Sequence, residues 1–239
     1  MTDRGRFYDT IAGDFDEIMN GYDLRRRLEV VYDDLLAGVD LAGRRVLDAG
    51  CGTGFFSARA KAAGAEVVSL DIGANLLRVA RKKGLTRLVA ADLLAAPFPD
   101  AAFDVVVSSE CIEHTPSPPA AVAELARVLK PGGVLALTCP NRFWHWSCVV
   151  AGALGVRSYQ GFENWPGWWS LERWLGENGV SVRRHLGLHL FPFVLTPTQP
   201  LLRRLDRAGN LVGPLFVNQC VLGIKRAGAK SAGDKGGPV

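Results

Sequence analysis

Apolar and amphipathic segments alternate along the middle of the chain, between about residue 44 and residue 140. The apolar runs are short and nearly free of charge, which is typical of strands buried on both faces of a parallel sheet. The segments between them repeat apolar residues at helical spacing and end at glycine. This alternation predicts an α/β fold with a doubly wound, mostly parallel sheet. The expected strands are 44–50, 66–73, 85–92, 103–110 and 133–140, and the expected helices are 55–64, 74–84 and 119–133.

The segments that flank this core follow other patterns. The first 45 residues carry apolar residues at helical spacing, and we expect helix there up to a break at Gly43. Beyond Pro140 the alternation stops, and an aromatic, irregular stretch precedes a short helix over 170–179 with Ser170 as its N-cap. Two further strands, 180–191 and 215–226, are expected to complete a seven-stranded sheet, with the final strand antiparallel at its edge.

These segments predict one domain over residues 1–226, because no linker separates two independent units. A small, polar, glycine-rich tail follows, and its composition is typical of disorder. The expected parts are a helical cover over 1–45, a ligand-binding core over 46–141, a lid with acceptor-side insertions over 142–216, and a disordered tail over 227–239.

Composition narrows the class of protein. The chain has 239 residues, of which 48% are hydrophobic and 22% charged, as expected for a globular protein with a sizeable core. The net charge of +4 is spread along the chain, and clusters such as Arg25 to Arg27 favour solvated helix faces over nucleic-acid contacts. Five cysteines without a CxxC pair argue against a disulfide framework or a metal site, and favour a reducing cytoplasm. Neither a signal peptide nor a membrane-spanning helix is predicted.

The stretch VLDAGCGTG, from Val46 to Gly54, places three glycines between a strand and a helix. Such a loop presents backbone N–H groups at a helix N-terminus, where a nucleotide-like ligand can approach closely. A dinucleotide fingerprint needs a small residue where Phe55 stands, which argues against NAD. A phosphate-binding loop needs a lysine directly after the glycines, and the next one is Lys61.

The same stretch resembles the first motif of the class I S-adenosylmethionine-dependent methyltransferases. Similarity to that family extends over about Tyr8 to Asn141, and most resembles its small-molecule branch of ubiquinone and menaquinone biosynthesis methyltransferases. The resemblance implies S-adenosylmethionine as cofactor, S-adenosylhomocysteine as product, and no metal. It also implies cofactor contacts. These fall on Tyr8, Phe15, Asp48, Ala49, Gly50, Gly52, Asp71, Ile72, Asp92, Leu93 and Ser109.

The resemblance gives several of these residues a separate role. Asp48 would orient the glycine loop and the methionine amino group, and Asp71 would accept both ribose hydroxyls, for which a carboxylate offers two acceptors. Asp92 would receive the adenine amino group beside Leu93, although a turn or cap residue is the alternative. Ile72 would pack on the adenine. Tyr8 and Phe15 would belong to a helix that folds over the cofactor.

Candidate catalytic residues follow the fourth expected strand in SSECIEH. Methyl transfer needs alignment of the acceptor with the methyl group and exclusion of water, and a hydroxyl acceptor also benefits from a base. His114 is the candidate base, with a structural histidine as the alternative, and Glu110 and Glu113 are further candidates. This segment differs from the Asn/Asp-Pro-Pro-Tyr motif of nucleic-acid amino-methyltransferases. Cys51 and Cys111 are interpreted as small apolar residues rather than arsenic ligands.

Aromatic residues gather in the expected lid and suggest a flat or lipophilic acceptor, with a small lid core as the alternative. A second insertion, 189–216, combines apolar and basic residues and is expected to contact a membrane surface, the substrate pocket or a second copy. A monomer or a homodimer both fit. The rival classes are a non-catalytic S-adenosylmethionine-binding subunit and an NAD-linked oxidoreductase. The candidate acceptor contacts are Phe143, Trp144, Trp146, Trp165, Trp168 and Trp169.

Overall fold

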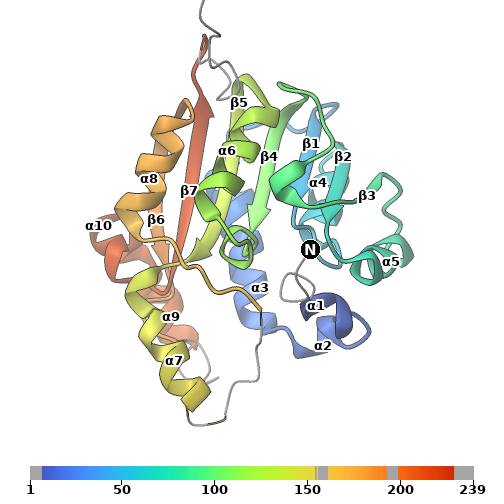
Figure 1. Ribbon diagram of the computed structural model, residues 1–239. Helices are drawn as coiled ribbons and strands as arrows, with labels where there is room; N and C mark the ends of the chain where they lie inside the picture. Colours follow the sequence, from blue (N-terminus) through green and yellow to red (C-terminus); the bar gives the residue numbers. More distant parts are fainter. Residues whose placement is uncertain (1–6, 154, 156–160, 193–198, 229–239) are drawn as a thin grey trace, which may run out of the picture.

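The computed structural model describes residues 7–153, 155, 161–192 and 199–228 (Figure 1). Within these residues one sheet contains seven strands in the order β3-β2-β1-β4-β5-β7-β6. Residues 229–239 of the expected tail and residues 193–198 of the second insertion lie outside the described part. The strands are β1 Arg45–Ala49, β2 Glu66–Asp71, β3 Leu88–Ala90, β4 Phe103–Ser109, β5 Leu129–Pro140, β6 Val180–Leu188 and β7 Asn218–Lys225.

The first five strands form the parallel part of the sheet. β1 pairs in parallel with both β2 and β4, β3 joins β2, and β5 joins β4. The doubly wound arrangement predicted from the apolar pattern is therefore confirmed. Because the carboxyl ends of parallel strands meet at one edge, the loops that follow β1, β2 and β4 are brought together there.

The last strand does not lie at the edge, and this prediction was wrong. β7 is antiparallel as expected, but it pairs with β5 on one side and β6 on the other, so β6 is the edge strand. The burial of the two strands explains the order. Nearly every residue of β7 is inaccessible, whereas the middle of β6 is partly exposed. A strand that is apolar on both faces is stabilised by a central position.

Helices cover both faces of the sheet. On one face, α6 and α8 pack through Leu125 and Leu171 against β1, β4 and β5, and on the other, residues around Val31 pack with α4. Among the described residues no helix is both long and apolar enough to cross a membrane. The helices are α1 Phe7–Thr10, α2 Phe15–Ile18, α3 Gly21–Leu28, α4 Phe55–Ala62, α5 Ala74–Lys82, α6 Pro118–Val128, α7 His145–Ala153, α8 Trp168–Glu177, α9 Gln199–Leu205 and α10 Gly209–Val212.

The N-terminal cover is helical, as expected, but it is broken into short pieces. α1 and α2 are single turns below the carboxyl edge of the sheet, and α3 continues into a π-helix over Glu29–Leu35 (Figure 1). Helix therefore ends at Leu35 rather than near Gly43. Asn20 caps α3 by accepting hydrogen bonds from the backbone N–H groups of Tyr22 and Asp23. This break turns α3 toward the strand ends.

Two predicted helix boundaries also differ from the structure. α8 begins at Trp168 with Gly167 as its N-cap, so Ser170 lies in the first turn and not at the cap. α6 ends at Val128, and the Pro-Gly-Gly segment that was expected to close it belongs to β5. Pairing of Leu129 with Phe103 of β4 ends α6 before the Pro-Gly-Gly segment.

Candidate active site

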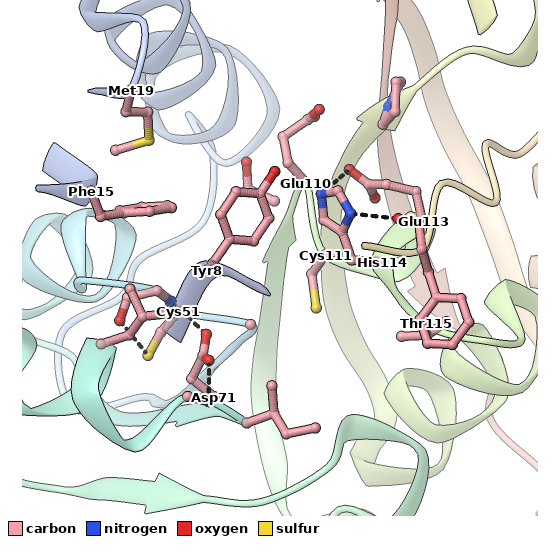
Figure 2. Close-up of a pocket in the computed structure, with 18 of the residues that line it drawn as sticks. Tyr8, Phe15, Met19, Cys51, Asp71, Glu110, Cys111, Glu113, His114 and Thr115 are labelled. Atoms are coloured by element: carbon pink, nitrogen blue, oxygen red, sulfur yellow. Dashed lines mark hydrogen bonds and ion pairs between the residues drawn. The ribbon is translucent and has the colours of Figure 1, made fainter. Parts of the chain in front are cut away.

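A cavity of about 930 Å³ opens at the carboxyl edge of the sheet, between the strand ends and helices α1 to α3. Figure 2 shows residues from the N-terminal cover and from the loops after β1, β2 and β4 around it. The structure thus brings together most of the residues predicted from the sequence. Those that line the cavity are Tyr8, Phe15, Gly50, Gly52, Asp71, Ile72, Asp92, Leu93, Ser109, Glu110, Glu113, His114 and Trp165.

The glycine loop needs glycine for two different reasons. Gly50, Gly52 and Gly54 all have positive φ angles, of 76°, 53° and 88°. A Cβ on Gly50 would also lie 2.2 Å from the Cys111 Sγ, whereas the nearest atom at Gly52 is on Phe15, 3.6 Å away. The missing side chain at Gly50 therefore makes room for Cys111, and the one at Gly52 leaves space at the cavity wall.

We expect Gly50→Ala to lower the free energy of unfolding by about 3 kcal/mol, from a left-handed backbone and a clash that requires repacking. Gly43→Ala is the matched control, because Gly43 has a φ of 68° but no atom within 4 Å of its Cβ position. That control should lose only about 1 kcal/mol in urea denaturation. Equal losses in both variants would contradict the contribution of Cys111.

Asp71 holds the glycine loop and also lines the cavity. Its two carboxylate oxygens accept hydrogen bonds from the backbone N–H groups of Gly52 and Gly73, both at 2.8 Å. Burial raises the pKa of Asp71, and these two backbone donors oppose that shift. Each oxygen keeps acceptor capacity for a ligand hydroxyl. Asp71 is thereby fixed in one orientation at the end of β2.

Asp48 and Ala49 lie behind the loop rather than in the cavity wall. The Asp48 carboxylate is buried and accepts a hydrogen bond from the Ser57 Oγ at 2.6 Å, while the Ala49 carbonyl accepts one from Ser108. Burial raises the pKa of Asp48 to about 7, with Asp71 adding to the shift. The structure therefore does not place Asp48 in the cavity wall, where the family resemblance had implied a ligand contact. Its contacts tie β1 to α4.

Asp92 is a cap residue, the alternative considered from the sequence, and it also borders the cavity. It caps the short turn Leu93–Ala95 by accepting a hydrogen bond from the Leu94 N–H at 2.9 Å, and it also lines the cavity. Leu93 is buried beside it, and Ile72 lines the same wall from the end of β2. These residues form a mixed polar and apolar wall on the side of β2 and β3.

The N-terminal cover is held over this wall by aromatic and polar contacts. The ring of Tyr8 packs edge-on against Phe15 and against His114, with centroids 5.4 and 5.2 Å apart. Asp9 accepts a hydrogen bond from the backbone N–H of Asn75 at 2.6 Å. Figure 2 shows Tyr8 and Phe15 between Met19 and the strand ends. The cover therefore closes one side of the cavity.

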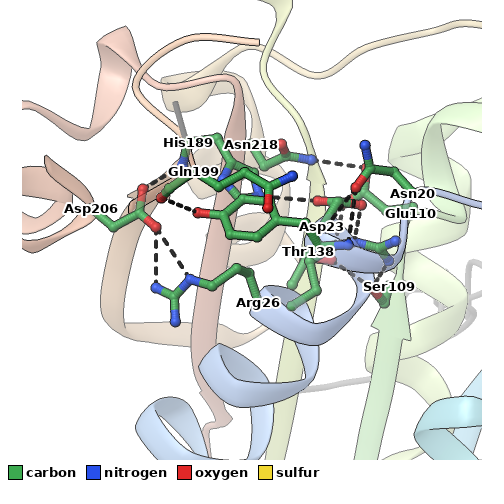
Figure 3. A network of polar contacts seen from close by, with 12 residues as sticks. Asn20, Asp23, Arg26, Ser109, Glu110, Thr138, His189, Gln199, Asp206 and Asn218 are labelled. Atoms are coloured by element: carbon green, nitrogen blue, oxygen red, sulfur yellow. Dashed lines mark hydrogen bonds and ion pairs between the residues drawn. The ribbon is translucent and has the colours of Figure 1, made fainter. Parts of the chain in front are cut away.

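Arg27 and Asp23 form a buried ion pair that the sequence did not reveal. Arg27 was predicted to lie on a solvated face, but its side chain is 7% exposed, with its Nε 2.8 Å from Asp23 and its Nη1 2.8 Å from the Ser109 Oγ. Burial alone would raise the pKa of Asp23, but Arg27 and His189 outweigh it and lower that pKa. Both residues line the cavity, and their network is drawn in Figure 3. The feature of the sequence that could have indicated this ion pair is the spacing of four residues, which places both side chains on one helix face.

The three candidate catalytic residues lie together after β4. Glu110 accepts hydrogen bonds from Thr138 and Asn218, and its backbone has a φ of 51°. Burial raises the pKa of Glu110 and raises that of Glu113 well above the ordinary value. The His114 Nδ1 lies 2.9 Å from the Phe162 carbonyl, and its Nε2 is 3.7 Å from the Glu113 carboxylate.

The aromatic residues of the expected lid divide into separate groups. Trp165 lines the cavity, together with Phe162. Trp168 is buried between α8 and β6, where its ring stacks on His185 with centroids 3.4 Å apart. The remaining candidates lie outside the cavity wall, so acceptor contact is not supported for them or for Trp168. These are Phe143, Trp146 and Trp169, which are exposed, and Trp144, which stacks on Trp146.

Comparison with known protein families gives a match over part of the chain. Residues 47–137 match the family described as methyltransferase domain. The match spans the loop Gly50 to Gly54 and strands β2 to β4, so this part of the chain is similar to a methyltransferase domain. Within the described residues, no group of three or more histidine, cysteine, aspartate or glutamate side chains is arranged to hold a metal ion.

Part of the chain resembles the ubiquinone biosynthesis O-methyltransferases. It is 42% identical over 116 residues to that of Xanthomonas oryzae pv. oryzae, which covers 46% of this chain and 48% of the relative. It is 37% identical over 128 residues to the malonyl-[acyl-carrier protein] O-methyltransferase of Serratia marcescens, covering 52% and 50%. The chain thus spans about half the length of these relatives.

A solved structure supports the fold over more of the chain. The S-adenosylmethionine-dependent methyltransferase of Mesorhizobium loti superposes with a TM-score of 0.62 and 20% identity, over 83% of this chain and 98% of that one. At this level of identity the likeness shows the fold alone.

Proposed function

We propose that the cavity binds S-adenosylmethionine and that the protein transfers its methyl group to a small acceptor. The observation that carries this proposal is the shared cavity wall of the glycine loop, Asp71 and Asp92. Asp71 would accept the ribose hydroxyls and Asp92 the adenine amino group, with Ile72 and Leu93 against the adenine. Calorimetry with S-adenosylhomocysteine tests the proposal, and a folded protein that does not bind it would refute it.

Arg27 is proposed as the partner of the methionine carboxylate. Among the described residues that line the cavity, it is the one with a permanent positive charge. We expect Arg27→Lys to weaken binding of S-adenosylhomocysteine about tenfold, since a lysine keeps the charge but not the fork that contacts Asp23 and Ser109. Arg25→Lys, on the exposed side of the same helix, is the control and should bind normally. Unchanged affinity in Arg27→Lys would place the carboxylate elsewhere.

The reaction we propose is O-methylation, as the names of both relatives indicate for those proteins. The bound cofactor supplies an electrophilic methyl group. The chain would align the acceptor oxygen with it and exclude water. Hydrogen bonding to the Phe162 carbonyl requires a proton on the His114 Nδ1, so the Nε2 is the nitrogen that would take the hydroxyl proton. N- or C-methylation of the same acceptor class is the alternative.

The acceptor is proposed to be lipophilic or aromatic. Beyond the residues assigned to the cofactor, the cavity wall is largely apolar and belongs to α2, α3, α7 and the segment around Phe162 and Trp165. It includes Ile18, Met19, Leu24, Pro140, Cys148, Ala151 and Val217. Methyl transfer from labelled cofactor to a panel of alkylated phenols, sugars and amines tests this proposal. Binding of S-adenosylhomocysteine without turnover of any of them would favour a non-catalytic cofactor-binding subunit.

A peripheral membrane contact is also proposed for the surface formed by the segments around α7 and α10. Leu211, Trp146 and Phe143 are 86%, 58% and 53% exposed, and the Trp144 Nε1 donates to the Leu215 carbonyl, which joins the two segments that carry them. Exposed apolar side chains next to arginines are typical of surfaces that contact anionic lipids. Sedimentation with anionic liposomes at low salt tests this, and a protein that stays in the supernatant would refute it.

A further inference from the structure

Buried acceptor atoms of Glu113 and Asn218, both in the cavity wall, lack a hydrogen-bond partner among the described residues. Within the part of the chain that the structure describes, neither the Glu113 Oε2 nor the Asn218 Oδ1 meets a donor. Glu113 is 1% exposed and Asn218 is 4% exposed, and both line the cavity. Leaving a buried polar atom unsatisfied costs free energy, so such atoms call for an explanation.

The side-chain donors of Asn218 and Thr138 already have other partners. Asn218 gives its own Nδ2 hydrogen to the Glu110 carboxylate at 3.0 Å, and Thr138 donates to the other oxygen of Glu110 at 3.1 Å. Arg27 donates to Asp23 and Ser109. A molecule in the cavity can supply the missing donors. Figure 3 shows Asn218 and Glu110 side by side, and Figure 2 shows Glu110 and Glu113 following the same strand.

The position of the two atoms in the fold separates them from the cofactor residues. Asp71 and Asp92 follow β2 and β3 in one half of the sheet. Glu113 follows β4, and Asn218 begins β7, where it pairs with Pro140 of β5 in the other half. The apolar wall proposed for the acceptor adjoins this half through Pro140 and Val217.

We propose that Glu113 and Asn218 determine acceptor specificity by accepting hydrogen bonds from a polar head group that donates O–H or N–H hydrogens. The inference rests on the proposed function, because it assigns the acceptor half of the same cavity. The acceptor is accordingly an apolar molecule with hydrogen-bond donors at one end. A head group in which those hydrogens are replaced by methyl groups leaves both atoms unsatisfied and is rejected.

Three probes with the same apolar tail test the proposal by calorimetry, with and without S-adenosylhomocysteine. The phenol probe is 4-heptyloxycatechol and the aniline probe is para-heptyloxyaniline, each with two donor hydrogens, and the anisole probe is 4-heptyloxy-1,2-dimethoxybenzene, which has none. The phenol and the aniline should each bind about tenfold more tightly than the anisole to the unaltered protein. Equal affinity for all three would overturn the proposal, and the phenol and aniline together separate an O–H from an N–H head group.

Matched variants assign the preference to the two atoms. Glu113→Met removes the acceptor at similar length and should abolish the preference while raising the melting temperature, because an unsatisfied buried atom is lost. Glu163→Met makes the same change at another glutamate of the cavity wall and should keep the preference. Asn218→Ala should lose the preference, and Asn218→Gln should retain it, because the amide keeps both an acceptor oxygen and a donor for Glu110.

The outcomes distinguish this inference from the proposed function. A donor preference that disappears in Glu113→Met, in a protein that does not bind S-adenosylhomocysteine, would support the acceptor pair and refute the cofactor assignment. Binding of S-adenosylhomocysteine with no donor preference would do the reverse. Loss of the preference in Glu163→Met to the same extent as in Glu113→Met would attribute it to cavity charge and overturn the inference.

Discussion

Replacing Asp71 by alanine is expected to weaken binding of S-adenosylhomocysteine about a thousandfold. The variant loses a carboxylate that can accept two ribose hydroxyls, and hydrogen bonds to a charged group contribute about 1.5 to 3 kcal/mol each. It also frees the backbone N–H groups of Gly52 and Gly73, which the carboxylate now holds at 2.8 Å. Isothermal titration calorimetry measures the affinity, and urea denaturation measures any loss of stability.

Asp71→Asn separates these two contributions. The amide keeps the shape of the side chain, but its NH₂ group faces either the Gly52 or the Gly73 donor, so one of the two loop contacts is lost. We expect an affinity between those of the alanine variant and the unaltered protein. An alanine variant that binds S-adenosylhomocysteine within a few-fold of normal would refute the ribose role and leave Asp71 a structural residue of the loop.

The second large effect is a pH dependence that originates at Asp48. Burial raises the pKa of this carboxyl group to about 7 from an ordinary 3.8, so the folded protein binds one more proton than the unfolded chain between these values. Stability from this group is therefore fully present below about pH 4 and is lost as the pH rises toward about 7. At about 1.4 kcal/mol for each pH unit, the loss is about 4 kcal/mol.

Asp48→Asn is the reference for this measurement, because an amide resembles the protonated acid and can still accept the Ser57 hydrogen bond. The stability of the unaltered protein minus that of the variant should fall as the pH rises from about 4 to about 8, which removes the contribution of other carboxylates. A constant difference across that range would show that Asp48 ionises normally and is hydrated in the folded protein.

The half of the cavity proposed for the cofactor was largely predictable from the sequence, whereas the half proposed for the acceptor was not. Gly50, Gly52 and Asp71 lie within one strand-loop-helix unit and the next strand, so local order along the chain places them at one edge. Asn218 reaches the cavity because β7 inserts beside β5, a pairing across about eighty residues that no local pattern encodes.

The aromatic residues and Arg27 show the same contrast between what the sequence predicts and what packing decides. Trp165 and Trp168 are three residues apart in a tryptophan-rich stretch, yet one lines the cavity and the other stacks on His185 in the core. Arg27 and Arg25 are both part of one basic run, but the turn of α3 buries the first and exposes the second. Composition shows which residue types are abundant, whereas packing decides which of those residues line the cavity.

The sequence by itself determined the alternation of strands and helices, the glycine loop and the acidic residues after β2 and β3, because strand burial and loop geometry are local properties. Tertiary structure alone decided that β7 is central, that Asp48 lies behind the loop, and that Glu113 and Asn218 border one cavity. These features depend on contacts between distant segments, whose free energies appear only when the sheet is assembled.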